Sequence, residues 1–296
     1  MIKPLESDHP GKTPRGAASK WLFVILTVCL IAPTSLFVHD YMLETMKVPY
    51  PRYVGLPEWV KFINEVVRLF ALTVVCRLSL PRLRSFSKVT AVIGSGLILM
   101  MLYETLRVWV IEGAITNSLV FSAYSRAPQA ICLFLGGAAV AWTVLSGLKS
   151  KNAAGLIVMV AALLTFVIFP PLDHLFASLK NGMPFVKDLY SDPYPFKINV
   201  IIYISFVEPT IAAFAAAWLC WPALRGTLLR RALTFATLLL LVRGRFVQLL
   251  LQSFWVRLPH ITAMYAVSQF FLETLVLAVL TALAWNSAER FEAKGR

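Results

Sequence analysis

Four ionisable residues in the second half of the chain lie within long apolar stretches, and their types could bind ions or carry protons. They are Glu208, Arg243, Arg245 and Glu273. A glutamate can take up and release a proton, and the planar guanidinium of arginine can bind a carboxylate or phosphate through two hydrogen bonds. A charge at the centre of a membrane helix is unfavourable by about 2.5 kcal/mol or more. We therefore predict these four residues as a substrate-binding or proton-coupling site.

Two pairs in the first half share the spacing Glu-x-x-Arg: Glu65 with Arg68, and Glu104 with Arg107. Residues three apart lie on one face of a helix, so each pair can form within its own helix. Their two helices are predicted to run in opposite directions, and we expect the four charges to close into one intramembrane ring. The alternative to a functional site is a static salt-bridge network, which adds little net stability but fixes which helices pair.

The local sequence around the deep charges also predicts their geometry. Arg243 and Arg245 are two residues apart, which is about 200° around a regular helix, so we do not expect them to share one face. Pro209 directly follows Glu208 and lacks a backbone donor, so it can free a carbonyl in the preceding turn. Such an arrangement suits a transport site, and a static network could use it as well.

Three histidines are weak candidates for metal ligands: His39, His174 and His260. Imidazole nitrogens together with the neighbouring aspartates could bind zinc or copper. However, no two of these histidines are four residues apart on one helix, and all three lie at predicted span ends. We interpret them as polar residues at the membrane interface, and we predict no metal and no cofactor.

The sequence contains no motif for nucleotide or hydrolytic chemistry. There is no G-x-x-x-x-G-K-[ST] loop, no H-E-x-x-H and no G-x-S-x-G. The formal net charge of +13 comes from residues spread over several short pieces beside the predicted spans. A nucleic-acid-binding protein would gather such charge on one face. We therefore predict membrane lipids as partners, keep protein subunits of a membrane complex as an open alternative, and predict no nucleic acid.

Transmembrane helices must position these side chains. The chain has 296 residues, of which 58% are hydrophobic and 15% are charged, whereas a soluble domain has about 25% charged residues. Apolar runs of about twenty residues can cross a membrane as helices, which satisfy their own backbone hydrogen bonds there. The sequence predicts an all-α polytopic membrane protein with eight spans, at 21–38, 57–80, 89–110, 127–148, 153–171, 200–221, 232–252 and 261–285.

Lysine and arginine in the connections predict the orientation, because cytoplasmic segments are enriched in them. With the N-terminus inside, every inside segment is basic, including those around Arg82, Lys149 and Arg231. The outside segments hold fewer lysines and arginines. We predict a plasma-membrane protein with both termini cytoplasmic, that is, N-in and C-in.

Similar residues recur in the same order in the two halves. Trp109-Val110 precedes Ile115-Thr116, and Trp255-Val256 precedes Ile261-Thr262 at the same spacing. We predict two tandem four-helix repeats in parallel orientation, because four spans per copy return the chain to its starting side. The predicted parts are a disordered cytoplasmic tail 1–20, a first transmembrane repeat 21–148, a cytoplasmic linker 149–152, a second repeat 153–286 and a cytoplasmic tail 287–296.

Three functions are compatible with these features. The leading hypothesis is a small inner-membrane carrier or permease-like protein that moves or binds a small charged or amphiphilic solute at the midplane Glu/Arg site. The alternative is a non-catalytic subunit or assembly partner of a larger membrane complex. The third is an intramembrane enzyme acting on a lipid headgroup. The sequence shows no metal-binding carboxylate set or histidine-based cluster, so an enzyme is the least favoured.

Overall fold

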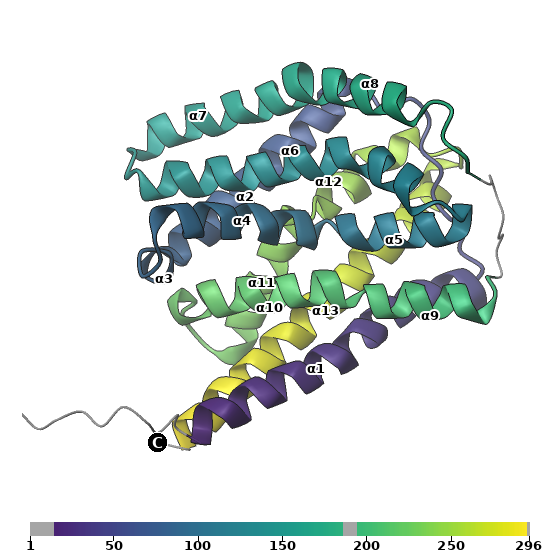
Figure 1. Cartoon of the computed structure of the whole chain (residues 1–296). Coiled ribbons are helices and arrows are strands. Elements are labelled where there is room, and N and C mark those ends of the chain that lie inside the picture. Colours follow the sequence, from purple (N-terminus) through teal and green to yellow (C-terminus); the bar gives the residue numbers. More distant parts are fainter. Residues whose placement is uncertain (1–14, 186–193, 295–296) are drawn as a thin grey trace, which may run out of the picture.

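Helices make up 83% of the residues that the structure describes. The computed structural model describes residues 15–185 and 194–294, and within them no strand is present, apart from one isolated bridge between Tyr53 and Val256. Most of the helices in front run side by side across Figure 1, whereas α1 (Arg15–Asp40) and α13 (His260–Lys294) run together toward its lower left.

The helices of the first half are α1 (Arg15–Asp40), α2 (Glu58–Leu78), α3 (Leu80–Leu83), α4 (Lys88–Leu102), α5 (Thr105–Thr116) and α6 (Leu119–Leu145). Those of the second half are α7 (Ser150–Ala162), α8 (Phe169–Lys180), α9 (Phe196–Ser205), α10 (Val207–Cys220), α11 (Leu228–Val242), α12 (Arg245–Leu250) and α13 (His260–Lys294). Short π-helical turns follow α1 and α7 as η1 (Tyr41–Thr45) and η2 (Leu163–Ile168), and 3-10 turns form η3 (Trp221–Ala223) and η4 (Gln252–Trp255).

Five described helices are long and apolar enough to cross a membrane: Ala18–Thr45, Leu119–Leu145, Ser150–Lys180, Phe196–Ala223 and His260–Arg290. The pair α4 and α5 would form a sixth, bent by 45°. The chain is therefore a multi-pass membrane protein of five or six candidate spans. The predicted spans 57–80 and 232–252 are also helical, but α2 carries several charges and α11 ends after 15 residues.

Three predicted boundaries differ from the structure. The helix that was expected to end at Pro170-Pro171 continues to Lys180, because the π-helical turn η2 precedes the prolines, which lie in the first turn of α8. Residues 15–20 are helical and part of α1, whereas they were predicted as disordered; residues 1–14 lie outside the described part. At the other end, α13 extends into the predicted tail as far as Lys294.

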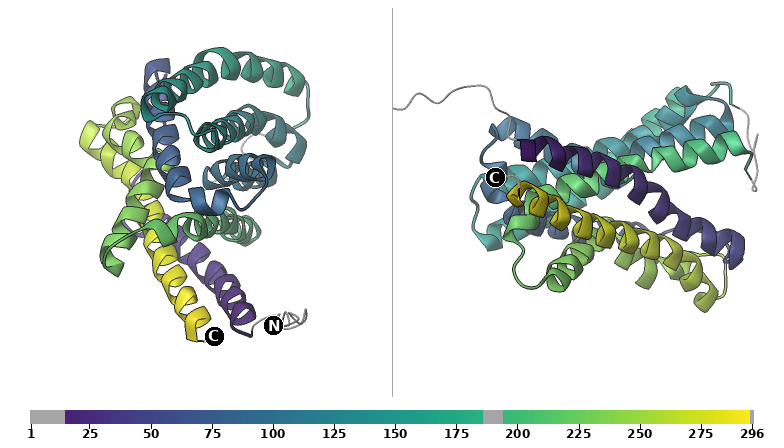
Figure 2. Two further views of the ribbon diagram at one scale, coloured as in Figure 1. Left: turned by 90° about the vertical axis from the view of Figure 1, so that its left-hand side faces the viewer. Right: turned by 90° about the horizontal axis from the view of Figure 1, so that it is seen from below.

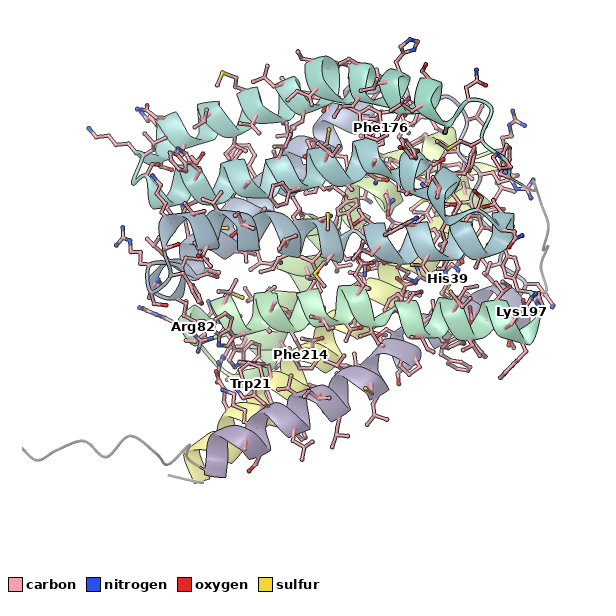
Figure 3. All side chains as sticks on the ribbon, viewed as in Figure 1. Trp21, His39, Arg82, Phe176, Lys197 and Phe214 are labelled. Atoms are coloured by element: carbon pink, nitrogen blue, oxygen red, sulfur yellow. The ribbon has the colours of Figure 1, made fainter. Side chains whose placement is uncertain are left out.

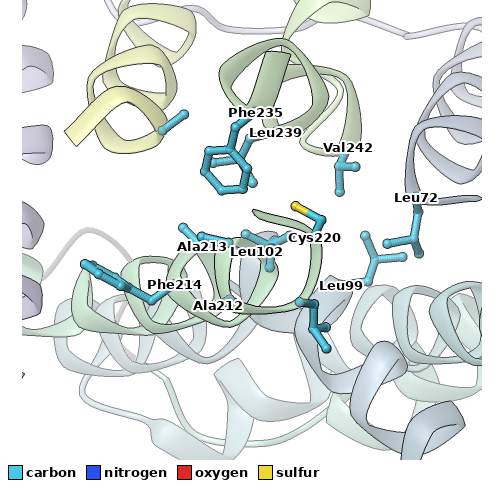
Figure 4. Packing of buried hydrophobic residues seen from close by; sticks show 14 of the residues in the cluster. Leu72, Leu99, Leu102, Ala212, Ala213, Phe214, Cys220, Phe235, Leu239 and Val242 are labelled. Carbon is cyan, nitrogen blue, oxygen red and sulfur yellow. The ribbon is translucent and has the colours of Figure 1, made fainter. Parts of the chain in front are cut away.

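An apolar core lies between α2, α4, α10 and α11 (Figure 4). Alanines of α10, among them Ala212, Ala213 and Ala217, keep this helix thin, so large side chains such as Phe235 can pack against it. Close approach also joins α4 to α6: a Cβ atom on Gly137 would lie 2.7 Å from the carbonyl oxygen of Ser95. Lipid leaves no hydrophobic driving force between membrane helices, so van der Waals packing must hold them together. The small residues allow this close packing.

The described ends of the chain lie at one end of the bundle (Figures 1 and 2). There the rings of Trp21 in α1 and Trp285 in α13 meet edge to face, with their centroids 6.3 Å apart. We call this end the terminal end. The opposite end carries the connection 46–57, and we call it the loop end.

Candidate functional site

Glu104 is the centre of a buried charge cluster. Its carboxylate forms ion pairs with Arg107 and Arg243, and it lies 3.6 Å from the Nη2 atom of Arg245. The residue has a left-handed backbone (φ 59°) and separates α4 from α5. That conformation is unfavourable by about 1–2 kcal/mol for a residue with a Cβ atom. At this break, the Glu104 carboxylate contacts arginines from both halves of the chain.

A second break places both arginines of the second half at this carboxylate. Helix α11 ends at Val242, Gly244 is left-handed (φ 68°), and α12 begins at Arg245. The expectation that Arg243 and Arg245 cannot share one face is wrong, because it assumed a regular helix and Gly244 interrupts it. Arg245 is held further by α12 and α13, since its Nε donates to Thr274 at 3.2 Å and its Nη1 to Gln248 at 2.7 Å.

Glu273 of α13 adds a second carboxylate to the cluster. One of its oxygens lies 3.7 Å from the Nη2 atom of Arg243, and both side chains are almost fully buried. Arg243 thus bridges Glu104 and Glu273. This places charges from the α4–α5 break, the α11–α12 break and α13 in one group.

Glu208 takes part in a different way. Its carboxylate accepts hydrogen bonds from the backbone N–H groups of Leu106, at 3.1 Å, and Arg107, at 2.5 Å. Those N–H groups belong to the first turn of α5, where an intrahelical partner is missing and the helix dipole favours a negative charge. Glu208 therefore caps the half-helix α5 from α10. A third helix break, between α9 and α10 at Phe206, lies two residues before it.

Glu65 and Arg68 pair with each other inside α2 but stay apart from the Glu104 cluster. The expected ring of Glu65, Arg68, Glu104 and Arg107 is therefore wrong. The guanidinium of Arg68 lies 4.3 Å from the centre of the Tyr103 ring, which separates the two pairs. The second carboxylate for Glu104's arginines comes from α13, because Arg243, next to the break at Gly244, reaches both Glu104 and Glu273.

The Glu104 cluster consists of the carboxylates of Glu104, Glu208 and Glu273 and the guanidiniums of Arg107, Arg243 and Arg245. It is therefore formally neutral. Yet its hydrogen-bonding groups are not all used. In the described part of the protein, Nε of Arg107 and both Nε and Nη1 of Arg243 are buried without an acceptor, and Oε1 of Glu104 and Oε1 of Glu273 are buried without a hydrogen-bond donor, so unused donors outnumber unused acceptors. An unpaired buried donor costs about 1–3 kcal/mol. The cluster could therefore accept an additional anionic group without adding guanidiniums.

Aromatic side chains lie on the loop-end side of Arg245. His39 of α1 stacks on Phe270 of α13 with ring centroids 5.1 Å apart, and Tyr50 meets both rings edge to face. The guanidinium of Arg245 lies 5.3 Å from the centre of the Phe270 ring. His39, labelled in Figure 3, thus belongs to the surroundings of the charge cluster.

The connection 46–57 is fastened across the segment before α13. The N–H of Val54 donates to the carbonyl of Trp255 at 2.8 Å, and the N–H of Arg257 to that of Arg52 at 3.1 Å. Tyr50 is carried by this fastened segment. The backbone bonds therefore fix the aromatic group beside the arginines.

The other two histidines lie apart from His39. His174 and His260 are both exposed, and His260 stacks on Phe254 with ring centroids 4.1 Å apart. Among the described residues, no three His, Cys, Asp or Glu side chains gather closely enough to hold a metal ion.

Two residues at the junction were not predicted from the sequence. Asn64 of α2 and Tyr103 of α4 both face Gly244, where a Cβ atom would lie 2.7 Å from the Tyr103 hydroxyl and closer still to Asn64 Oδ1. Asn64 is an uncharged polar residue inside α2, directly before Glu65. That pattern was the available signal, since a polar side chain within a membrane helix needs a partner.

No known protein family, curated protein sequence or solved structure is significantly similar to this chain.

Proposed function

We propose that this protein is a small carrier, of the permease type, that binds a small anionic or amphiphilic solute at the Glu104 cluster and moves it across the plasma membrane. The observation that carries the proposal is the set of buried guanidinium N–H groups without an acceptor, on Arg107 and Arg243. They lie where the α4–α5, α9–α10 and α11–α12 helices are interrupted. Interrupted helices around a midplane site are typical of secondary transporters.

The arrangement of Glu208 suggests how a proton could be coupled to the solute. As a carboxylate, Glu208 accepts from two N–H groups of α5 beside Arg107. Protonation removes its negative charge and weakens both bonds, since charge-assisted hydrogen bonds are about twice as strong as neutral ones. A solute carboxylate or phosphate could then take its place near Arg107 and Arg245, with Glu273 balancing Arg243.

Uptake by proteoliposomes tests this proposal. We expect entry of at least one of three radiolabelled anions (acetate, benzoate, inorganic phosphate) above that of empty liposomes. Arg245→Gln should lower the initial rate about tenfold, equivalent to about 1.4 kcal/mol. Glu208→Gln should retain uptake but lose its stimulation by an inward proton gradient. Arg126→Gln removes an arginine from an accessible pair with Glu112 and should leave uptake unchanged.

Two outcomes would contradict the carrier. One is that none of the three anions enters faster than into empty liposomes. The other is a rate of uptake that Arg245→Gln does not lower, together with a Glu208→Gln variant that a proton gradient still stimulates. Transport would then not depend on the Glu104 cluster. Thermal unfolding of each purified variant serves to exclude loss of the fold as the cause.

The proposal includes eight spans in two parallel four-helix repeats, 21–148 and 153–286, with both termini cytoplasmic. The third predicted span of each copy supports the repeat, because α4–α5 and α11–α12 both break at a left-handed residue. The ends of α1 and α13 lie side by side. Such neighbouring ends are expected when a chain crosses the membrane an even number of times, because it then returns to its starting side. In intact cells, single cysteines placed at Ser19 and Ser287 should resist a membrane-impermeant thiol reagent, whereas one at Met46 should react. Labelling of only one terminal position would exclude the proposed topology.

A second candidate, a non-catalytic subunit of a membrane complex, is favoured by the formal neutrality of the cluster. In that case the ion pairs serve to fix the helices. Purification in a mild detergent distinguishes the two, because a subunit should co-purify with other proteins in fixed stoichiometry.

A further inference from the structure

At the terminal end, two arginines from different helices lie over neighbouring tryptophans. The guanidinium of Arg82, in α3, is 5.3 Å from the ring centre of Trp218, and that of Arg231, in α11, is 4.2 Å from that of Trp221. Trp218 lies in the last turn of α10, and Trp221 begins η3 directly after that helix. Both cations therefore lie at the end of α10. Figure 3 shows Arg82 at this end of the bundle.

The group has more donors than acceptors. Nη1 of Arg82, Nε of Arg231 and Nε1 of Trp221 are buried, and in the described part of the chain none of the three has a hydrogen-bond acceptor. Trp221 is fully buried, at 0% exposure. Arg231 uses its Nη2 for the carbonyl of Trp221, at 3.1 Å, and for Glu289, at 3.9 Å. That leaves three N–H groups, two of them cationic, for a ligand that only accepts.

The ligand chemistry follows from these donors. A phosphate presents several anionic oxygens and can accept from two guanidiniums at once. We propose that Arg82, Arg231 and Trp221 bind the phosphate of an anionic membrane lipid between α3, α10 and α11. The site lies at one end of the apolar helices α10 and α11. Basic pockets between membrane helices bind anionic headgroups on the cytoplasmic side, where the proposed topology puts this end of the bundle. Free phosphate shares the chemistry but has no tail to place beside the helices.

Thermal unfolding of the purified full chain in detergent tests this site. Dioleoyl phosphatidylglycerol should raise the unfolding midpoint, and dioleoyl phosphatidylcholine at the same concentration should not. Arg82→Gln should remove at least half of that rise. Arg82 is suited to the test because it takes part in no ion pair within the described residues. Arg84→Gln is the matched control, since Arg84 is exposed two positions away and the net charge changes equally.

The remaining outcomes decide between the sources of the phosphate. If inorganic phosphate at equal ionic strength reproduces the rise, and Arg82→Gln removes it, the site binds free phosphate and the lipid assignment is wrong. An equal loss in Arg84→Gln, or an equal rise with phosphatidylcholine, would show unspecific attraction and overturn the site. Should Arg82→Gln not fold, Arg82→Lys replaces it: one ammonium cannot reproduce the guanidinium fork, so the lipid-induced rise should still shrink.

Discussion

Glu104→Gln is expected to lower the free energy of unfolding by about 3–5 kcal/mol, the usual consequence of removing one partner from a buried charge group. Glu104 is the carboxylate that Arg107, Arg243 and Arg245 share. With glutamine in its place, three guanidiniums at this junction would share the two remaining carboxylates, Glu208 and Glu273. Titration of the purified protein with sodium dodecyl sulfate in mixed micelles measures this loss, with tryptophan fluorescence as the signal.

Two variants show whether the loss comes from the charge group. Glu112→Gln breaks an ion pair of the same residue types at the loop end, where Arg126 and Glu112 are 2.8 Å apart but accessible. It should change the free energy of unfolding by no more than about 1 kcal/mol. The double variant Glu104→Gln with Arg243→Gln removes one charge of each sign. We expect it to be more stable than the sum of the single losses predicts, by more than about 0.5 kcal/mol. Strict additivity would contradict direct coupling of the two residues.

The sequence was sufficient to predict the class of the fold. An apolar run of about twenty residues favours a helix, which satisfies its own backbone hydrogen bonds in the membrane, and each predicted span contains a helix in the structure. The spacing Glu-x-x-Arg also predicted the intrahelical pairs of α2 and of the α4–α5 junction, because a separation of three residues fixes the geometry locally.

The partners between helices could not be predicted, for a physical reason. They depend on two backbone breaks at left-handed residues, Glu104 and Gly244. A glycine in an apolar helix permits such a break without requiring it. A glutamate gives no local signal at all, since its left-handed conformation is unfavourable and persists only because the ion pairs of the folded protein hold it. Tertiary contacts therefore determine which side chains pair between helices, and the helical period of the sequence does not reveal these contacts.

The same reasoning applies to Glu208 and to the prolines of α8. Glu208 was expected to face a substrate, and its carboxylate accepts from the start of α5, which became available only because α4 and α5 are separate helices. Pro170 and Pro171 were expected to end a span, yet they occupy the first turn of α8 after a π-helical turn. In both cases the expected chemistry of the residue holds: a buried carboxylate accepts hydrogen bonds, and a proline lies at a helix terminus. What the sequence did not predict is the position of the helix boundary, which decides the partner of Glu208 and the helix to which the prolines belong.

Gly244→Ala should have a comparably large effect, because Gly244 lies where α2, α4 and α11 meet. A Cβ atom there would lie 2.7 Å from the Tyr103 hydroxyl and closer to Asn64 Oδ1, both well inside van der Waals contact. Overpacking of this kind costs about 1–3 kcal/mol. The positive φ adds about 1–2 kcal/mol for any residue with a Cβ atom. Detergent titration should therefore show a lowered free energy of unfolding, and anion uptake should fall because Arg243 and Arg245 no longer converge on Glu104.

Two controls separate the causes of this effect. Gly155→Ala places a methyl group on α7 where no atom lies within 4 Å, and it should raise stability by about 0.5–1 kcal/mol through helix propensity. Combining Gly244→Ala with Asn64→Ala removes the closest clash and leaves the one with the Tyr103 hydroxyl. This double variant should therefore recover part of the overpacking and retain the loss due to the backbone. A Gly244→Ala protein as stable as the wild type would mean that α11 and α12 do not need the left-handed glycine, and the shared carboxylate at Glu104 would need another explanation.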